Sequence, residues 1–165
     1  MKTQLNRFVL IFPVVLLAGL IINAYSHCQI PCGIYGDQMR FDMMLEDLQT
    51  VEKSMKQIEE ISKSAPVNYN QLVRWVNNKE EHAQKIQDII TQYFLAQRVK
   101  PAQPGSPEFE EYQKKLVLLH QIHFYTMKAK QSTDLAVVSQ IRDLIEQFHN
   151  IYFSPEDKKH LQEHK

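Results

Sequence analysis

The sequence has 165 residues, of which 44% are hydrophobic and 23% are charged, and its 19 basic residues are balanced by 19 acidic ones. No basic stripe stands out, so we expect no nucleic-acid partner. A chain of this length forms one domain with a core of its own, so its two cysteines are not needed as a disulfide scaffold.

The first 26 residues have the three parts of an export signal: a basic start, an apolar run over residues 8–22, and a short polar exit with the small residues Ala24 and Ser26. The apolar run is about 15 residues long, whereas a membrane-spanning helix needs roughly 20. We therefore expect residues 1–26 to be a signal peptide cleaved before His27, with an uncleaved membrane anchor as the alternative. A cleaved signal predicts a periplasmic or secreted protein that meets the membrane only through the transient signal peptide.

Cleavage before His27 gives the mature chain a distinctive start, because its first two residues then offer a free amine, an imidazole and the thiol of Cys28. Loss of the leader removes Lys2 and Arg7, so 17 basic residues against 19 acidic ones leave a formal charge of −2.

Apolar residues recur at intervals of three and four along four segments, which is the spacing of one helical stripe. The predicted helices cover about residues 38–63, about 68–98, a third from about 107 to the turn signal at 131–133, and a fourth up to about 152. Short connections and only four glycines predict an all-α fold, an antiparallel four-helix bundle over residues 38–153. An N-terminal segment (27–37) precedes it, and a charged C-terminal tail (154–165), which we expect to fray, follows it.

Two polar residues are predicted to cap these helices. Asn68 precedes the second helix, and Ser106 precedes the third with Pro107 in its first position. The stripe of the third helix passes through His123 and Met127 and is predicted to face the core. His123 shares a face with His120, but without a third ligand we expect hydrogen-bonded histidines there rather than a metal site.

The new N-terminus concentrates the groups that bind transition metals. The amine of His27 and the deprotonated amide nitrogen of Cys28 would close one five-membered chelate ring, and the Cys28 thiolate would close a second. Pro31 and Gly33 bracket Cys32, so a tight turn would bring its thiolate to the fourth corner of the same plane. A square-planar set of two nitrogens and two sulfurs suits Ni(II) or Cu(II) rather than Zn(II).

Two thiolates and an amidate donate strongly, which stabilises a higher oxidation state, and an axial imidazole from His27 would favour it further. This interpretation predicts a redox-active metal. The alternative is a disulfide between Cys28 and Cys32, the usual fate of an even number of cysteines in an exported protein.

The nine residues from His27 to Tyr35, HCQIPCGIY, resemble the nickel-hook motif H-C-x-x-P-C-G-x-Y of the nickel superoxide dismutases at every fixed position. A weaker resemblance extends through the end of the second helix, the Pro-rich turn and the last two helices, so that it spans residues 27–153. It implies a four-helix bundle that assembles as a homohexamer, with one nickel ion per subunit. It also implies conversion of superoxide to dioxygen and hydrogen peroxide through a Ni(III)/Ni(II) couple.

Carried over to this chain, the resemblance implies that the metal ligands are His27, Cys28 and Cys32. Tyr35 would complete the catalytic residues at the mouth of the site, where it would order water and limit access. Pro31 would shape the hook.

Other positions around the implied site depart from the family pattern. The family commonly holds the axial imidazole with a glutamate and an arginine. The nearest acid here is Asp42, after a one-residue shift, and the arginine position falls near Asn78 or Lys79. Tyr93 matches a second tyrosine near the family's pocket. A shorter acid and a lost guanidinium would leave the imidazole less firmly oriented, which typically costs roughly 10- to 100-fold in metal affinity or activity.

Two functions of other classes stay open. One is a nickel or copper carrier that presents the same hook without turnover, and the other is a helical adhesion or assembly protein whose N-terminus is a disulfide loop. Metal content separates the last from the other two, and superoxide dismutation separates the enzyme from the carrier.

Overall fold

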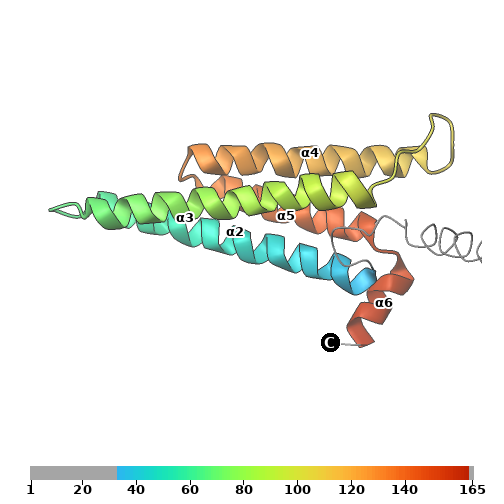
Figure 1. Cartoon of the computed structure of the whole chain (residues 1–165), viewed down its shortest axis with the longest axis horizontal. Helices are drawn as coiled ribbons and strands as arrows, with labels where there is room; N and C mark the ends of the chain where they lie inside the picture. The colour runs from blue at the N-terminus through green and yellow to red at the C-terminus, as the bar shows by residue number, and fades with distance from the viewer. Residues whose placement is uncertain (1–32, 164–165) are drawn as a thin grey trace, which may run out of the picture. The chain divides into compact units, whose positions relative to one another are not determined.

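The structure is a computed structural model that describes residues 33–163, with only the backbone described at Ile34 and Tyr35. The predicted signal peptide (1–26) and the hook residues 27–32 lie outside the described residues. All regular elements between residues 33 and 163 are helices, in agreement with the predicted all-α class. In chain order they are α2 (Ile34–Ser62), α3 (Tyr69–Asp88), the π-helix η1 (Ile89–Arg98), α4 (Phe109–Gln131), α5 (Leu135–Tyr152) and α6 (Pro155–Glu163) (Figure 1).

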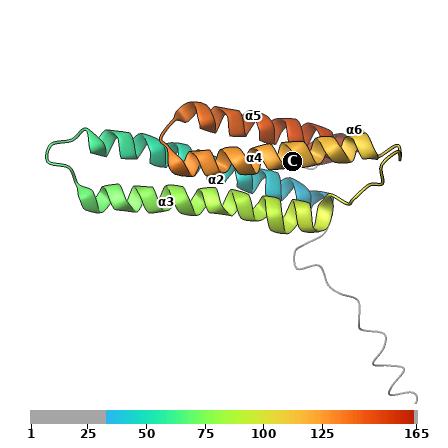
Figure 2. The ribbon, with the colours of Figure 1, turned by 90° about the horizontal axis from the view of Figure 1, so that it is seen from above.

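Residues 33–163 have four long helical segments, which are α2, α3 continued by η1, α4 and α5. They lie side by side, as Figures 1 and 2 both show. α2 packs along α3, and α4 packs along α5, while α2 also contacts α5 and α3 also contacts α4. Successive segments run in opposite directions, so the start of α2 lies at the same end as the ends of η1 and α5 (Figure 1). We call residues 33–163 the helical body.

The buried core of the helical body follows the predicted stripe on α2. Five of its side chains, spaced by three or four residues, are each at most 1% exposed: Phe41, Met44, Leu48, Val51 and Met55. The stripe of the second predicted helix is buried only from its middle onward, where its fully buried members are Ala83, Ile86, Ile90 and Phe94. Burial of this apolar surface is the main force that holds the helices together, because short isolated helices are only marginally stable in water.

The second predicted helix changes its winding part-way, because α3 continues directly into η1. At its end, the Val99 N–H donates to the carbonyl oxygen of Phe94, five residues back, at 2.8 Å. Such turns bring residues five apart close together, whereas in an α-helix they point about 140° away from each other. Tyr93 and Arg98 are five apart, and in η1 both side chains reach the same partner, Asp37.

The face that α4 buries differs from the predicted one. Met127 is 41% exposed and His123 is only half-buried. Leu119, which lies on the predicted stripe, is buried, and the other buried side chains of α4 are Ile122, Thr126 and Ala129. Apolar residues occur nearly all around α4, so periodicity alone does not select a face. Small residues let the helices approach closely, and the Thr126 hydroxyl stays satisfied because it donates to the Ile122 carbonyl oxygen at 2.7 Å.

The predicted helix caps had different outcomes. Asn68 is the N-cap of α3, and its side-chain oxygen accepts a hydrogen bond from the Gln71 N–H at 3.2 Å. The prediction for Ser106 is wrong, because α4 begins later, after Glu108, and the buried Ser106 hydroxyl has no hydrogen-bond partner within the described residues.

Within the predicted tail, residues Pro155–Glu163 form the helix α6 rather than a frayed segment. Ser154 and Asp157 cap α6 reciprocally, since each side chain accepts a hydrogen bond from the backbone N–H of the other, at 3.1 and 3.0 Å. Leu161 is buried, and α6 contacts α2. A capping pair and one apolar anchor therefore order a segment whose charged composition suggested disorder.

Candidate functional site

All three predicted metal ligands, His27, Cys28 and Cys32, lie outside the part of the chain that the structure describes. Pro31 lies outside it too, and the side chain of Tyr35 is likewise not described. The described residues begin at Gly33, directly after Cys32. The described residues nearest to the predicted ligands in the sequence are therefore those at the start of α2.

Gly33 has a backbone conformation that favours glycine. Its φ of 121° and ψ of 164° lie in a region that side-chain-bearing residues rarely enter. No side chain caps α2 at this position, and the Gly33 carbonyl oxygen accepts the first hydrogen bond of the helix, from the Asp37 N–H at 3.0 Å. The backbone therefore bends at Gly33, immediately before α2 begins.

Asp37 is the centre of a buried polar cluster in the first turn of α2. It is only 3% exposed, and its carboxylate accepts hydrogen bonds from three side chains: Tyr93, Arg98 and Tyr152, the last at 2.9 Å. Arg98 also donates through Nε to the Tyr152 hydroxyl at 3.2 Å. A buried carboxylate is tolerated only when it is paired and hydrogen-bonded, and here both oxygens have partners. We call these four residues the Asp37 cluster.

The pKa values of the three donor side chains in the Asp37 cluster are all raised, so these donors stay protonated. Burial raises the pKa of Tyr93 well above its usual range, and the hydrogen bond to Asp37 raises it further. Burial also raises the pKa of Tyr152 to about 12. For Arg98, burial alone would lower the pKa, but the hydrogen bonds to Asp37 and Tyr152 outweigh it and raise the pKa. Both tyrosines therefore remain neutral hydrogen-bond donors near neutral pH.

Two arginine side chains lie against the ring of Tyr93. The guanidinium carbon of Arg40 lies 5.2 Å from the centre of the Tyr93 ring, and that of Arg98 lies 6.0 Å from it. The Nε of Arg40 is buried and has no hydrogen-bond acceptor within the described residues. Two cations therefore lie against one aromatic ring beside the Asp37 carboxylate.

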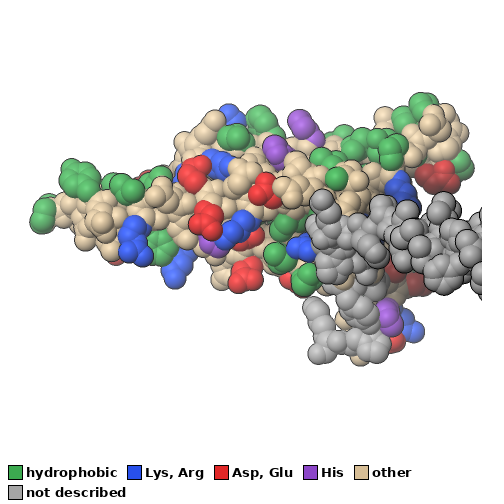
Figure 3. Space-filling model, viewed as in Figure 1, with side chains coloured by type: hydrophobic (Ala, Val, Ile, Leu, Met, Phe, Trp, Pro, Cys, Tyr) green, Lys and Arg blue, Asp and Glu red, His purple; other side chains and the backbone are tan. Residues whose placement is uncertain are grey.

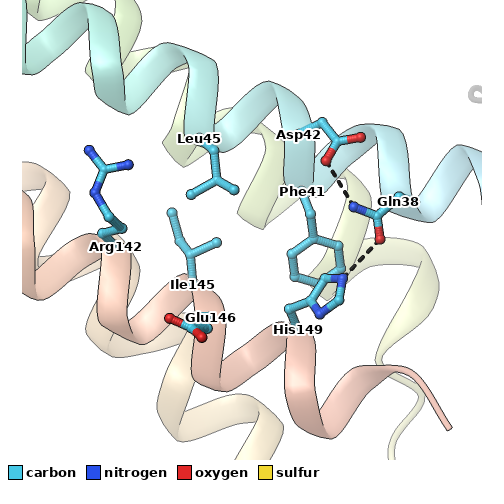
Figure 4. A pocket seen from close by; sticks show the side chains of 8 residues that line it. All are labelled: Gln38, Phe41, Asp42, Leu45, Arg142, Ile145, Glu146 and His149. Carbon is cyan, nitrogen blue, oxygen red and sulfur yellow. Dashed lines mark hydrogen bonds between the residues drawn. The ribbon is translucent and has the colours of Figure 1, made fainter. Parts of the chain in front are cut away.

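Asp42, the predicted acidic partner of the His27 imidazole, lies on α2 one turn after Gln38. It accepts a hydrogen bond from the Gln38 amide at 2.8 Å, and the Gln38 oxygen in turn bonds to His149 Nε2 at 2.8 Å (Figure 4). These residues edge a groove of about 420 Å³ between α2 and α5, which is lined by Gln38, Phe41, Asp42, Leu45, Arg142, Ile145, Glu146 and His149. The groove thus offers a carboxylate and an imidazole joined by one amide.

The structure does not bring Asn78 or Lys79 to Asp42 or Tyr93. Asn78 donates to the Ser54 hydroxyl at 2.9 Å. Lys79 is 5% exposed, and its ammonium group donates to backbone carbonyl oxygens around the α4–α5 turn, among them those of Ala129 at 3.0 Å and Ser132 at 3.1 Å. A cation at these carbonyl groups stabilises the C-terminal end of α4.

Sequence reasoning missed Asp37, Arg98 and Tyr152. Asp37 lies 61 positions from Arg98 and 115 from Tyr152, and no periodic pattern pairs residues across such separations. One signal was available, because an acidic residue in the first turn of a helix is a favourable position that merits attention. It does not by itself identify the partners.

Within residues 33–163, no group of three or more histidine, cysteine, aspartate or glutamate side chains comes together to hold a metal ion. On the face shown in Figure 3, basic and acidic side chains are interspersed over the helical body rather than gathered by sign. None of the described helices is both long and apolar enough to cross a membrane.

The family model of the nickel-containing superoxide dismutases matches residues 22–156, which is most of the chain. The chain belongs to this family. As a nickel-containing superoxide dismutase it is an oxidoreductase whose substrate is superoxide and whose metal is nickel. The match includes the segment HCQIPCGIY and nearly all of the helical body. Comparison with curated proteins and with solved structures finds no match.

Proposed function

We propose that this nickel-containing superoxide dismutase is exported, is cleaved before His27, and binds nickel through residues 27–32, the part of the predicted hook (27–37) that precedes Gly33 and α2 in the sequence. The observation that carries the proposal is the segment HCQIPCGIY, which agrees with the hook motif at every fixed position and lies inside the matched residues 22–156. Its place directly after a signal-like leader supports the processing, because only cleavage before His27 frees the terminal amine.

The donor set of the proposed hook fits nickel. The amine of His27, the amide nitrogen and thiolate of Cys28, and the thiolate of Cys32 would supply two nitrogen and two sulfur donors, and the His27 imidazole would supply a fifth donor. Strong planar donors suit Ni(II) and stabilise a higher oxidation state. Nickel held by these residues would supply a one-electron Ni(III)/Ni(II) couple, which suits the oxidation of one superoxide ion to dioxygen and the reduction of a second to peroxide.

The remaining roles belong to the chain's own groups. Pro31 shapes the turn before Cys32, Tyr35 limits access and orders water, and Asp42 orients the His27 imidazole. Reduction of superoxide to hydrogen peroxide consumes two protons. Tyr93 is a poor source for them, because its raised pKa keeps its proton, which it donates to Asp37 as a hydrogen bond. Its role is then to hold Asp37, and water is the better proton source.

The assembly and compartment are part of the same proposal. The four long helical segments form the antiparallel four-helix bundle of the family, and six subunits form a homohexamer. One face of α4 supports an assembly because it leaves apolar side chains in water, namely Val117, Phe124 and Met127. A signal peptide over residues 1–26 directs the enzyme to the periplasm or the medium, where superoxide, an anion that crosses membranes poorly, has to be removed at its source.

The intact mass of the natively purified, secreted protein tests this proposal, together with a superoxide dismutation assay. We expect a chain that starts at His27, carries one nickel ion and is active. A chain that retains its leader, or a metal-free chain with a Cys28–Cys32 disulfide, would contradict the hook. Nickel without dismutation would indicate a carrier instead.

A further inference from the structure

We propose that the Asp37 cluster is a positioning device for the nickel hook, which fixes the start of α2 and with it the point from which Cys32 reaches the metal. This inference rests on the proposed function, because it assumes that Cys32 is a ligand. It assigns Asp37, Arg98 and Tyr152 as positioning residues, none of which belongs to the motif.

The first step concerns what holds the beginning of α2. The first N–H groups of a helix have no partner within the helix, so this end frays unless something caps it. α2 has no side-chain cap at Gly33. Instead, the carboxylate of Asp37, one turn in, is bound by side chains from two other elements: Tyr93 and Arg98 of η1, and Tyr152 of α5. The start of α2 is thereby tied to the rest of the helical body.

The second step leads from Asp37 toward the hook. The Asp37 N–H donates to the Gly33 carbonyl oxygen at 3.0 Å, so the anchored residue is hydrogen-bonded to the residue that follows Cys32. Gly33 holds a φ of 121°, which gives the chain a sharp change of direction at that position. The path from the buried carboxylate to the last ligand thus contains one backbone hydrogen bond and one constrained residue.

The third step is the requirement of the metal. A metal site needs its donors held to within about 0.5 Å of their productive positions, and groups that orient ligands typically contribute roughly 10- to 100-fold to metal affinity or activity. A hook of a few residues has no core of its own and depends on the place where it is attached. The Asp37 cluster supplies a rigid attachment at the residue next to the hook's last ligand.

A matched pair of variants separates positioning from general stability. Asp37→Asn weakens the cluster. Asp47→Asn changes another buried carboxylate of α2, whose partner is His82 of α3 at 2.7 Å, farther from the start of the helix. Both would be made in the full chain processed to His27. Nickel affinity would be measured by competition with a chelator in buffer where each variant is folded, together with the absorption spectrum of the bound nickel and hydrogen exchange of the first amides of α2.

We expect Asp37→Asn to lower nickel affinity by roughly 10- to 100-fold and to speed exchange at the start of α2, whereas Asp47→Asn keeps the wild-type affinity and spectrum. Equal nickel affinity in both variants would overturn the inference while leaving the hook intact. Failure of the wild-type protein to bind nickel would overturn the hook and this inference together.

If Asp37→Asn does not fold, Tyr152→Phe decides the question, because it removes one hydrogen bond to Asp37 and keeps the ring that packs 5.5 Å from Phe41. We expect a smaller loss of nickel affinity in the same direction. An unchanged affinity in a folded Tyr152→Phe protein would reject the positioning role.

Discussion

Asp37 and Arg98 form an ion pair that joins the first turn of α2 to the last residue of η1, although 61 positions of sequence separate them. The pair is possible because η1 winds as a π-helix, which turns Arg98 to the same side as Tyr93. The buried carboxylate therefore depends on the winding of a different helix. The end of the molecule next to the predicted hook is built by tertiary contacts.

The cysteine ligands make the first prediction. Cys28→Ser and Cys32→Ser should each lose both nickel and dismutase activity, because a serine hydroxyl is not deprotonated near neutral pH and is a poor ligand for this set. His27→Gln should keep nickel through its terminal amine but lose most turnover. Metal analysis and a superoxide assay on each purified variant check these outcomes, and activity in either serine variant would contradict thiolate ligation.

Extension of the mature N-terminus is the second prediction. One extra residue ahead of His27 converts the terminal amine into an amide, which weakens a donor and alters both chelate rings. We expect loss of activity with the fold unchanged, measured by the superoxide assay and circular dichroism. An active extended protein would show that the free amine of His27 is not required.

Gly33 allows a backbone test with an internal control. Gly33→Ala should cost roughly 1–3 kcal/mol, because φ is 121° there and a Cβ has open space around it, so the penalty comes from the backbone alone. Gly105, with φ of 87° and equally open surroundings, should show a similar cost when changed to alanine. Only Gly33→Ala should also lower nickel affinity, as measured by chelator competition. A matching loss in Gly105→Ala would assign the effect to stability.

A substitution of Lys79 tests whether this residue stabilises the C-terminal end of α4 or takes the place of the family's arginine near the metal site. Lys79→Met removes an ammonium group that donates to carbonyl oxygens at the α4–α5 turn, so we expect a loss of roughly 1.5–3 kcal/mol of stability. Nickel affinity and activity per folded molecule should stay at the wild-type level. Denaturant unfolding and chelator competition measure the two quantities. A tenfold drop in nickel affinity would instead favour the arginine-like role predicted from sequence.

The pH dependence of stability reports on Tyr152. Burial raises the pKa of Tyr152 from 10.0 to about 12, so between these values the folded state binds more protons than the unfolded state. This contribution to stability is complete below pH 10 and is lost as the pH rises toward 12. Denaturant unfolding between pH 8 and 12 should show the fall, and Tyr152→Phe should make it shallower. Identical profiles would mean that Tyr152 titrates normally in the folded protein.

Local patterns were sufficient for much of the fold. The three- and four-residue spacing on α2 correctly identifies Phe41, Met44 and Leu48 as core, and Asn68 was identified as a cap because capping depends on neighbouring residues. The face of α4 was wrong where apolar residues surround the helix. α6 was missed because its order depends on a capping pair and on the burial of Leu161.

The sequence by itself determined the all-α class, the main core stripe and membership of the nickel-containing superoxide dismutases, because periodicity and the nine-residue motif are encoded in neighbouring residues. The roles of His27, Cys28 and Cys32 are predictions from that motif. Only the tertiary structure decided that Asp37 is held by Tyr93, Arg98 and Tyr152, and that Lys79 caps a helix end. These contacts join residues 50 or more positions apart, and their geometry depends on how the helices wind and pack.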